Sequence, residues 1–350
     1  MKKINVLQSW RAIFIVLICI EHMALQNKIA LLGAGAEGVS FFILLSGFLT
    51  GYIYQNKEID CSFSKSKDFL FKKLKKFYPL HIIAIVLSVI LELLYILKNF
   101  SVQVDRLLNL ALKAVLNATF LQVYIPVDGI YMNNIHGVGW FLSTIVFCYA
   151  NSLIGLKAIK YFNKKNKDIF LFGIVFVVYI TIIFFFKDSN LNQFILYVFP
   201  PVRYLEYFIA MIFGFSYNHI YAHIKDKIYL WGLFEGVSVI LLVVNHLGIK
   251  MGMYRESNYK YLTIFICSFV IIFVFSMEKG IISKLLNNKF LIDIGNASFY
   301  VYIMHQVIIK YVTTVFGWNN LGAIVSAFVI IIFTYITYNY DKLFKKKCIV

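Results

Sequence analysis

The chain has 350 residues, of which 61% are hydrophobic and 15% charged, and its formal net charge is +17. Soluble domains contain about 45–50% apolar residues, whereas apolar runs of about 18–22 residues, each long enough to cross a bilayer, recur here from end to end. The composition therefore excludes one large soluble core and predicts an all-α integral membrane protein. Because no Pro-rich or Ser-rich linker interrupts these runs, we expect one domain over residues 1–350.

About ten apolar segments are long enough to be membrane-spanning helices. If the N-terminus is inside, 23 of the 34 lysine and arginine residues fall in cytoplasmic segments, so the positive-inside rule predicts that both termini are cytoplasmic. The charge then follows from topology, and we expect contact with membrane lipid and no nucleic-acid partner. The predicted spans are 6–25, 38–55, 77–97, 138–156, 169–186, 202–220, 229–247, 260–277, 294–315 and 321–339.

The first span carries Arg11 and His22 within its length. Eleven residues at 100° each return to within about 20° of the starting direction, so both side chains project from one face, roughly 16 Å apart along the axis. Ionisable groups inside a membrane usually face the protein interior or a wet cavity. We therefore expect this face to be the floor of an active site. The alternatives are that Arg11 snorkels to the boundary and that His22 bonds a neighbour near the outer interface.

The second span opens with a run rich in glycine and alanine and contains Ser46 and Gly47. Small side chains let helices approach closely in lipid, so Ser46 and Gly47 are expected to kink the helix or to contact the first span. Glu37 and Ser40, near the outer end, are expected to face the same cavity as His22. Packing alone is the alternative explanation of the small residues.

A basic segment precedes the third span and ends at Tyr78 and Pro79. Within it, Lys73 and Lys76 are three residues apart, which places them on one face if the segment is helical. We expect them to bind the pyrophosphate of a cytoplasmic phosphorylated donor as point charges, without the bidentate geometry of arginine. The alternative is positive-inside anchoring of the chain and nothing more.

A long segment, 98–137, is expected outside the spans. Residues 104–120 within it are predicted to form an amphipathic helix with Leu108 and Val115 on its apolar face. Such a helix would lie in the interface or cap the bundle rather than cross the membrane. The polar and aromatic loop 124–137 is expected either to hold a sugar or to serve only as a connection.

Three later stretches carry further candidates for the site. Trp140 begins the fourth span, where a tryptophan more often belongs to the interfacial belt. Arg203 and Glu206 are three residues apart in the sixth span, so they are expected to pair with each other or to serve the site. In the ninth span His305 lies near mid-membrane with Tyr302 one turn before it. A hydrogen bond to a tyrosine or a carbonyl is the alternative role of His305.

The five cysteines are scattered without paired spacing and indicate no zinc site, redox motif or disulfide. Neither a Gly-x-Ser-x-Gly elbow nor a glycine-rich phosphate loop is present in the sequence. We therefore expect no metal and no bound cofactor, which leaves the membrane-embedded residues as candidates for the chemistry. The cysteines are Cys19, Cys61, Cys148, Cys267 and Cys348.

Taken together and in this order, these stretches resemble acyltransferase family 3, the bacterial membrane O-acyltransferases that modify cell-surface carbohydrates. The resemblance covers nearly the whole chain. It is carried by the Arg11 to His22 spacing, the Gly38–Leu49 block, the basic segment ending at Pro79, the Trp140–Ser143 block, Arg203-x-x-Glu206 leading to Gly214, and Ser298-x-x-x-Tyr302-x-x-His305.

Two positions depart from the family's pattern. The family's cytoplasmic Arg-x-x-Arg is Lys73-x-x-Lys76 here, and the aromatic residue after Ser298 is Phe299, which lacks the tyrosine hydroxyl. The larger members also carry an extracytoplasmic esterase-like domain, and we expect no such soluble extension in this chain.

The resemblance implies a multi-pass protein of the cytoplasmic membrane that transfers an acyl group, most simply acetyl, from acyl-CoA to a hydroxyl of a cell-envelope or lipid-linked glycan. Lys73, Lys76 and Arg11 are then expected to hold the phosphates of the co-substrate acetyl-CoA at the cytoplasmic mouth. His22 is expected to act as general base on the acceptor hydroxyl, or to form an acyl-histidine intermediate.

Two other classes of function stay open at this point. A transporter or flippase for a glycan precursor would use Arg11, His22 and Glu206 along a proton-coupled path, although the sequence has no evident inverted repeat of glycine- or proline-broken spans. A scaffold subunit of an envelope-synthesis complex would use neither chemistry. A surface glycan that lacks an ester but keeps its polymer would indicate transfer, and loss of polymer would indicate transport.

Overall fold

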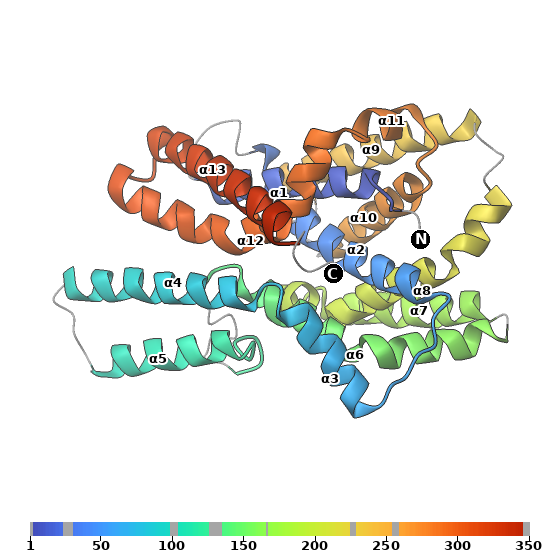
Figure 1. Ribbon diagram of the computed structural model, residues 1–350, viewed down its shortest axis with the longest axis horizontal. Coiled ribbons are helices and arrows are strands. Elements are labelled where there is room, and N and C mark those ends of the chain that lie inside the picture. Colours follow the sequence, from blue (N-terminus) through green and yellow to red (C-terminus); the bar gives the residue numbers. More distant parts are fainter. Residues whose placement is uncertain are drawn as a thin grey trace. The chain divides into compact units, whose positions relative to one another are not determined.

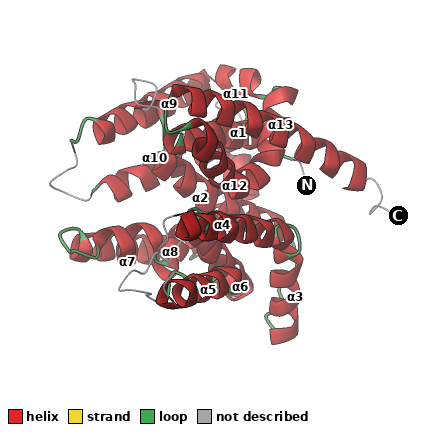
Figure 2. Cartoon of the chain, turned by 90° about the vertical axis from the view of Figure 1, so that its left-hand side faces the viewer, coloured by secondary structure: helices red, strands yellow, loops and turns green. Residues whose placement is uncertain are grey.

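The computed structural model describes residues 3–23, 31–98, 104–125, 135–165, 167–224, 229–253 and 259–345. Within these ranges the chain is helical and contains no strand, as predicted (Figures 1 and 2). Each predicted span coincides with a helix. These helices are α1 (Val6–His22), α2 (Gly35–Tyr54), α4 (Tyr78–Lys98), α6 (Gly139–Asn163), α7 (Asp168–Phe186), α8 (Pro200–Ile224), α9 (Tyr229–Lys250), α10 (Lys260–Ser276), α12 (Lys289–Phe316) and α13 (Asn320–Lys345).

Seven of the described helices are long and apolar enough to cross a membrane, namely α2, α4, α6, α7, α9, α12 and α13. The helices α1 and α10 have only 17 residues each, and the 25-residue α8 is not among the seven. The larger count of about ten spans therefore stays a prediction, as does the orientation of the termini. The remaining elements are α3 (Phe63–Leu74), α5 (Val104–Ala118), α11 (Ile281–Leu286) and a π-helical turn at Phe194–Val198.

The helices form two compact units, and each unit is assembled from separate segments of the chain. In the first unit α7 pairs with α8, and α9 pairs with α10. In the second unit α12 and α13 form a hairpin, and α4 packs on both α5 and α12 (Figure 1). The first unit comprises residues 1–7, 39–74 and 143–286, and the second comprises 8–38, 75–142 and 287–350.

Glycines bring α2 and α8 into backbone contact within the first unit. A Cβ atom at Gly47 would lie 2.1 Å from the carbonyl oxygen of Tyr207, and one at Gly51 would lie 2.0 Å from that of Met211. Gly214 makes the reciprocal contact from α8. Small residues four apart thus let two helices touch along their backbones. Gly47 therefore contacts α8, and the expected kink or contact with the first span stays a prediction.

The amphipathic helix predicted at 104–120 is present as α5 and runs beside α4 (Figures 1 and 2). Leu110 of α5 packs with Ile96 of α4 in one buried cluster. Leu108 and Val115, on the predicted apolar face, are exposed instead. The exposed apolar side chains of α5 are suited to contact with lipid. The side of the helix that carries Leu110 packs against the protein.

Candidate active site

Arg11 and His22 project from one face of α1 toward α12, within the second unit. Arg11 Nε donates a hydrogen bond to Ser298 Oγ over 3.1 Å, and His22 Nδ1 lies 3.2 Å from the side-chain nitrogen of Gln306. Three turns of α1 therefore face about two turns of α12. The prediction that both side chains share one face is confirmed.

Arg11 is half-buried, and its hydrogen bonds point into the unit. Gln8 Oε1 accepts from Arg11 Nη1 over 3.0 Å, and Ser298 donates its own proton to the Gly295 carbonyl over 2.7 Å. The Ser298 oxygen is thereby left to accept from Arg11. A Cβ atom at Gly295 would lie 1.9 Å from the Gln8 carbonyl oxygen, so α1 and α12 touch at this level. The guanidinium is held by its neighbours rather than extended along a lipid boundary.

His22 faces a second histidine, His305, whose ring centroid lies 5.2 Å from its own. His305 is fully buried, and its Nδ1 lies 2.7 Å from the Tyr302 carbonyl oxygen. A carbonyl only accepts, so Nδ1 carries the proton and Nε2 keeps a lone pair. That Nε2 has no hydrogen-bond partner among the described residues. The alternative role of His305 as a carbonyl-bonded buried histidine is confirmed, and it leaves a bare nitrogen near His22.

Two further histidines repeat this arrangement inside the second unit. His136 Nε2 lies 2.6 Å from the Ile303 carbonyl oxygen, and His81 Nε2 lies 3.0 Å from that of Asn117. Their ring centroids are 5.7 Å apart, and in the described part of the chain neither Nδ1 has a partner. Buried polar atoms are normally satisfied by protein or water. The bare nitrogens therefore mark a polar interior suited to water or to a hydroxyl-bearing ligand.

Sequence reasoning missed Gln306 and His81, and it included His136 only as part of the loop 124–137. For Gln306 only a weak signal was available, since it is eight residues after Ser298 and therefore about 80° around the axis of α12 from it. For the two histidines no local pattern gives the contact, because their carbonyl partners come from distant segments.

Trp140 and Tyr302 also belong to this side of the unit. Trp140 is buried in the first turn of α6 rather than exposed at an interface. The ring of Phe141, the next residue, lies 4.7 Å from that of Tyr302, which is in turn 5.6 Å from the His305 ring. The block that begins at Trp140 thus packs on the His305 turn of α12. Where the family has tyrosine, Phe299 packs edge-on against another phenylalanine ring, an apolar contact in which a hydroxyl is not needed.

Glu37 is buried in the first turn of α2. A Cβ atom at the next residue, Gly38, would lie 2.7 Å from Ile18 Cδ1, so this turn packs directly on α1. Ser46 belongs to the first unit, where it is half-buried and its carbonyl accepts a hydrogen bond from Thr50. Of the two, only Glu37 lies in the unit that contains His22.

Arg203 and Glu206 form a buried ion pair in the first unit, with Nη1 and Oε1 2.6 Å apart. Ser40 Oγ accepts from Arg203 Nη2 over 2.8 Å, and the Tyr179 hydroxyl donates to Glu206 Oε1 over 2.7 Å. The predicted pairing of Arg203 with Glu206 is confirmed. The Ser40 hydroxyl is engaged by Arg203 within the first unit, and the expectation that Ser40 faces the same cavity as His22 stays a prediction. The pair links α2, α7 and α8 within the unit, and Arg203 Nε and Glu206 Oε2 have no hydrogen-bond partner among the described residues.

Lys73 and Lys76 do not share a continuous helical face, because α3 ends at Leu74. Lys73 Nζ lies over the Phe69 and Tyr149 rings, 5.3 and 5.0 Å from their centroids, as a cation–π contact requires. Lys76 is exposed in the turn that follows α3. The aromatic rings orient one lysine, and the other is open to solvent.

The site residues predicted from the sequence thus fall into two groups. The first unit holds Ser46, Lys73, Arg203 and Glu206, and the second holds Arg11, His22, Glu37, Lys76, Trp140, Tyr302 and His305. Most of the loop expected to hold a sugar, 126–134, lies outside the described residues.

A family model described as an acyltransferase domain matches residues 4–339, nearly the whole chain. No curated protein and no solved structure gives a significant match. The matched range contains every residue of the candidate site.

Proposed function

Because the chain belongs to acyltransferase family 3, we propose that it transfers an acyl group, most simply acetyl, from cytoplasmic acyl-CoA to a hydroxyl of a cell-envelope or lipid-linked glycan. Family membership favours acyl transfer over a transporter or flippase. Seven long apolar helices make the protein integral to a membrane, which we take to be the cytoplasmic membrane. The observation that carries the proposal is the position of His22, at the end of α1 against His305 and Gln306 of α12.

As a general base, His22 must present a bare ring nitrogen to the acceptor hydroxyl. Its Nδ1 faces the Gln306 amide, and the oxygen and nitrogen of an amide are assigned from the hydrogen bonds around them. In the present orientation the buried Gln306 Oε1 lacks a partner among the residues described. Turning the amide over lets this oxygen accept from His22 Nδ1–H, so that Nε2 carries the lone pair. Gln306 is then the positioning residue that selects the basic tautomer of His22.

The proposed reaction balances without a further co-reactant. The acceptor hydroxyl gives its proton to His22 Nε2 while its oxygen attacks the thioester carbonyl carbon. The C–S bond breaks, coenzyme A leaves as a thiolate, and the imidazolium returns the proton to sulfur. A general base of this kind accelerates the reaction by roughly 10²–10⁴-fold.

The donor is assigned to the Arg11 end of the same face. Arg11 offers a planar fork of donors suited to phosphate oxygens, and Gln8 and Ser298 set its orientation. Lys73 and Lys76 are assigned to phosphates of the donor on the basis of their charge alone. The thioester then extends along α1 toward His22, roughly 16 Å away.

The acceptor is assigned to the His305 side of His22, where Trp140, Tyr302 and Glu37 complete the surroundings. The bare Nε2 of His305 can accept a hydrogen bond from a sugar hydroxyl.

Mass spectrometry of surface glycans from cells with and without the gene tests this proposal. We expect the strain without the protein to lack one acyl ester per repeat while it keeps the polymer. An unchanged ester content, or loss of the polymer itself, would contradict acyl transfer.

Two histidine variants test the role of His22 in the same assay. His22→Ala should fail to restore the ester, whereas the control His219→Ala, at an exposed position of α8, should restore it. Restoration by His22→Ala at equal expression would remove His22 from the mechanism.

A further inference from the structure

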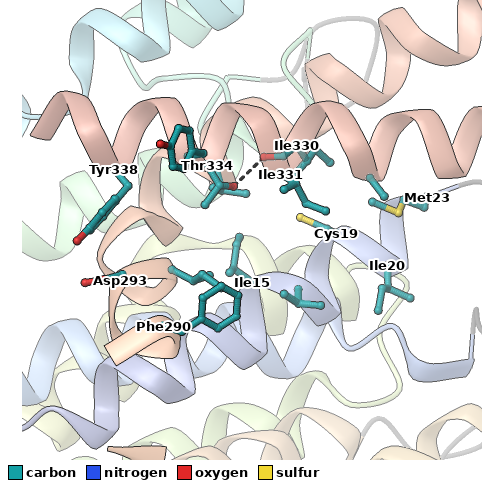
Figure 3. Close-up of a pocket in the computed structure, with 15 residues that line it drawn as sticks. Ile15, Cys19, Ile20, Met23, Phe290, Asp293, Ile330, Ile331, Thr334 and Tyr338 are labelled. Carbon is teal, nitrogen blue, oxygen red and sulfur yellow. Dashed lines mark hydrogen bonds between the residues drawn. The ribbon is translucent and has the colours of Figure 1, made fainter. Parts of the chain in front are cut away.

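An apolar groove of about 620 Å³ runs between α1, α12 and α13 in the second unit (Figure 3). Its floor is made by the buried side chains of Ile15, Cys19 and Ile330, and Ile331 stands exposed at its rim. The Thr334 hydroxyl, which also lines it, donates to the Ile330 carbonyl and is thereby satisfied (Figure 3). Apart from its polar end and Tyr335, the groove is lined almost entirely by apolar side chains.

At the polar end of the groove, Asp293 and Tyr338 both lie near the exposed Lys289 side chain. Lys289 Nζ lies 2.6 Å from Asp293 Oδ2 and 3.4 Å from the Tyr338 hydroxyl. Asp293 and Tyr338 lie together at one end of the view, and Met23 lies at the other (Figure 3). The groove therefore has direction, from a polar end at the start of α12 to an apolar end at the end of α1.

The apolar end adjoins the catalytic face of α1. Ile15, Cys19 and Met23 are spaced four residues apart, so they line one side of the helix, and Cys19 is about 60° around the axis from His22. Met23 directly follows His22 in the chain. The groove thus extends from the level of Met23 to the level of Ile15, roughly 12 Å along the axis.

We propose that this groove binds the hydrocarbon tail of a lipid-linked saccharide, the acceptor whose hydroxyl His22 deprotonates; the inference rests on the proposed function. A sugar or a CoA phosphate is excluded as occupant, because the lining would leave its polar groups unpaired. Burial of a hydrocarbon chain against Ile15 and Ile330 has no such cost.

The length and direction of the groove fit a lipid of the outer leaflet. The hydrocarbon core of a bilayer is about 30 Å thick, so one leaflet spans about 15 Å, and the groove covers most of that depth. With the N-terminus cytoplasmic, Met23 lies at the outer end. A tail that enters there runs inward past Cys19 to Ile15, and its saccharide stays at the level of His22.

A phospholipid chain would meet the same apolar surface, so the test compares the two lipids directly. Full-length protein in phosphatidylglycerol nanodiscs is exposed to a polyprenyl phosphate with a photoreactive group on its tail, or to a phosphatidylcholine with the same group on one acyl chain. Cross-linked residues are mapped by mass spectrometry. We expect the polyprenyl probe to label the groove segments of α1, α12 and α13, and the phosphatidylcholine probe to label exposed helix surfaces throughout.

Two tryptophan variants on α13 sharpen the comparison. Ile331 and Ile336 are 65% and 57% exposed, but only Ile331 lines the groove. Ile331→Trp should lower polyprenyl labelling several-fold while Ile336→Trp leaves it unchanged, and unchanged phosphatidylcholine labelling shows that both variants are folded. Equal polyprenyl labelling in the two variants, or the same labelling pattern with both probes, would overturn the groove assignment. Since labelling requires no acyl transfer, the glycan mass spectrum tests the proposed function separately.

Discussion

The imidazole rings of His22 and His305 lie 5.2 Å apart, one on α1 and the other on α12. Two imidazolium ions at this distance repel each other by about 3 kcal/mol at an effective dielectric constant of about 20. The single N–H group of neutral His305 already donates a hydrogen bond to the Tyr302 carbonyl oxygen. The pair is therefore expected to hold one additional proton at most, and during the reaction that proton belongs to His22.

The pH dependence of the acyl-transfer rate should show that His22 and His305 hold one additional proton between them. A general base must start neutral, so the rate is expected to be low in acid and to rise with pH through one proton dissociation. Initial rates of the purified protein against pH measure this, and the logarithm of the rate should rise with a slope of one. A slope of two would show that both rings are protonated together and would contradict the single shared proton.

Variants of Gln306 test the choice of tautomer. Gln306→Leu keeps similar volume but removes the acceptor for His22 Nδ1–H, so kcat should fall by roughly 10²-fold with little change in KM for acetyl-CoA. Gln306→Glu restores an acceptor and should recover most of the rate. If the Glu and Leu variants lose kcat equally, or if both change KM alone, Gln306 has no role in positioning His22.

The buried pair of Arg203 and Glu206 should show strong coupling in a double-mutant cycle. Arg203→Met leaves Glu206 charged and buried beside Tyr179, which is expected to cost about 3–5 kcal/mol of stability. The double variant with Glu206→Met removes both charges and should recover most of that loss. Thermal unfolding in detergent measures the three variants against the parent. Additive losses would show that the two side chains act independently.

The close contact of α2 and α8 predicts a steep response to one methyl group. In Gly47→Ala the new Cβ atom would meet the Tyr207 carbonyl oxygen at 2.1 Å, so the helices must separate and the melting temperature should fall by several degrees. Gly232→Ala in α9 is the control, since its Cβ atom would meet nothing within 4 Å. The control should be neutral or stabilising by up to about 1 kcal/mol. Equal shifts in both variants would refute the close contact.

Removal of the Lys73 charge should weaken donor binding and spare the chemistry. Lys73→Met is expected to raise KM for acetyl-CoA about tenfold with kcat nearly unchanged, because one charge-assisted contact with phosphate is lost. Lys76→Met should act in the same direction. Lys284→Met, on α11, is the control and should leave KM unchanged. An unaltered KM in Lys73→Met would remove this lysine from the donor site.

The parts of the structure that depend on local repetition were predictable from the sequence. Eleven residues make nearly three full turns, so the shared face of Arg11 and His22 followed from helix geometry alone. Arg203 and Glu206 are one turn apart, which made their pairing predictable as well. In each case the spacing within one helix determines the relation between the side chains.

The partners that tertiary packing supplies were not predictable. His81 bonds a carbonyl 36 residues away, and His136 bonds one 167 residues away, and backbone carbonyls leave no mark in the sequence. A glycine such as Gly47 allows a close approach by any neighbouring helix. Only the packing of the first unit determines that this neighbour is Tyr207. The helical face expected for Lys73 and Lys76 was lost because α3 stops one residue after Lys73.

The protons of His305 and His136 are fixed by neighbouring main-chain oxygens, those of Tyr302 and Ile303. Because these acceptors belong to the backbone, exchange of either side chain leaves them in place. The backbone position of α12 therefore determines which ring nitrogens of the cluster carry protons. Point substitutions at Tyr302 and Ile303 should leave this protonation pattern unchanged. A single-residue insertion or deletion between Ser298 and Gln306 would rotate the following residues by about 100° and dismantle the whole arrangement at once, so length in this stretch is under tighter constraint than side-chain identity.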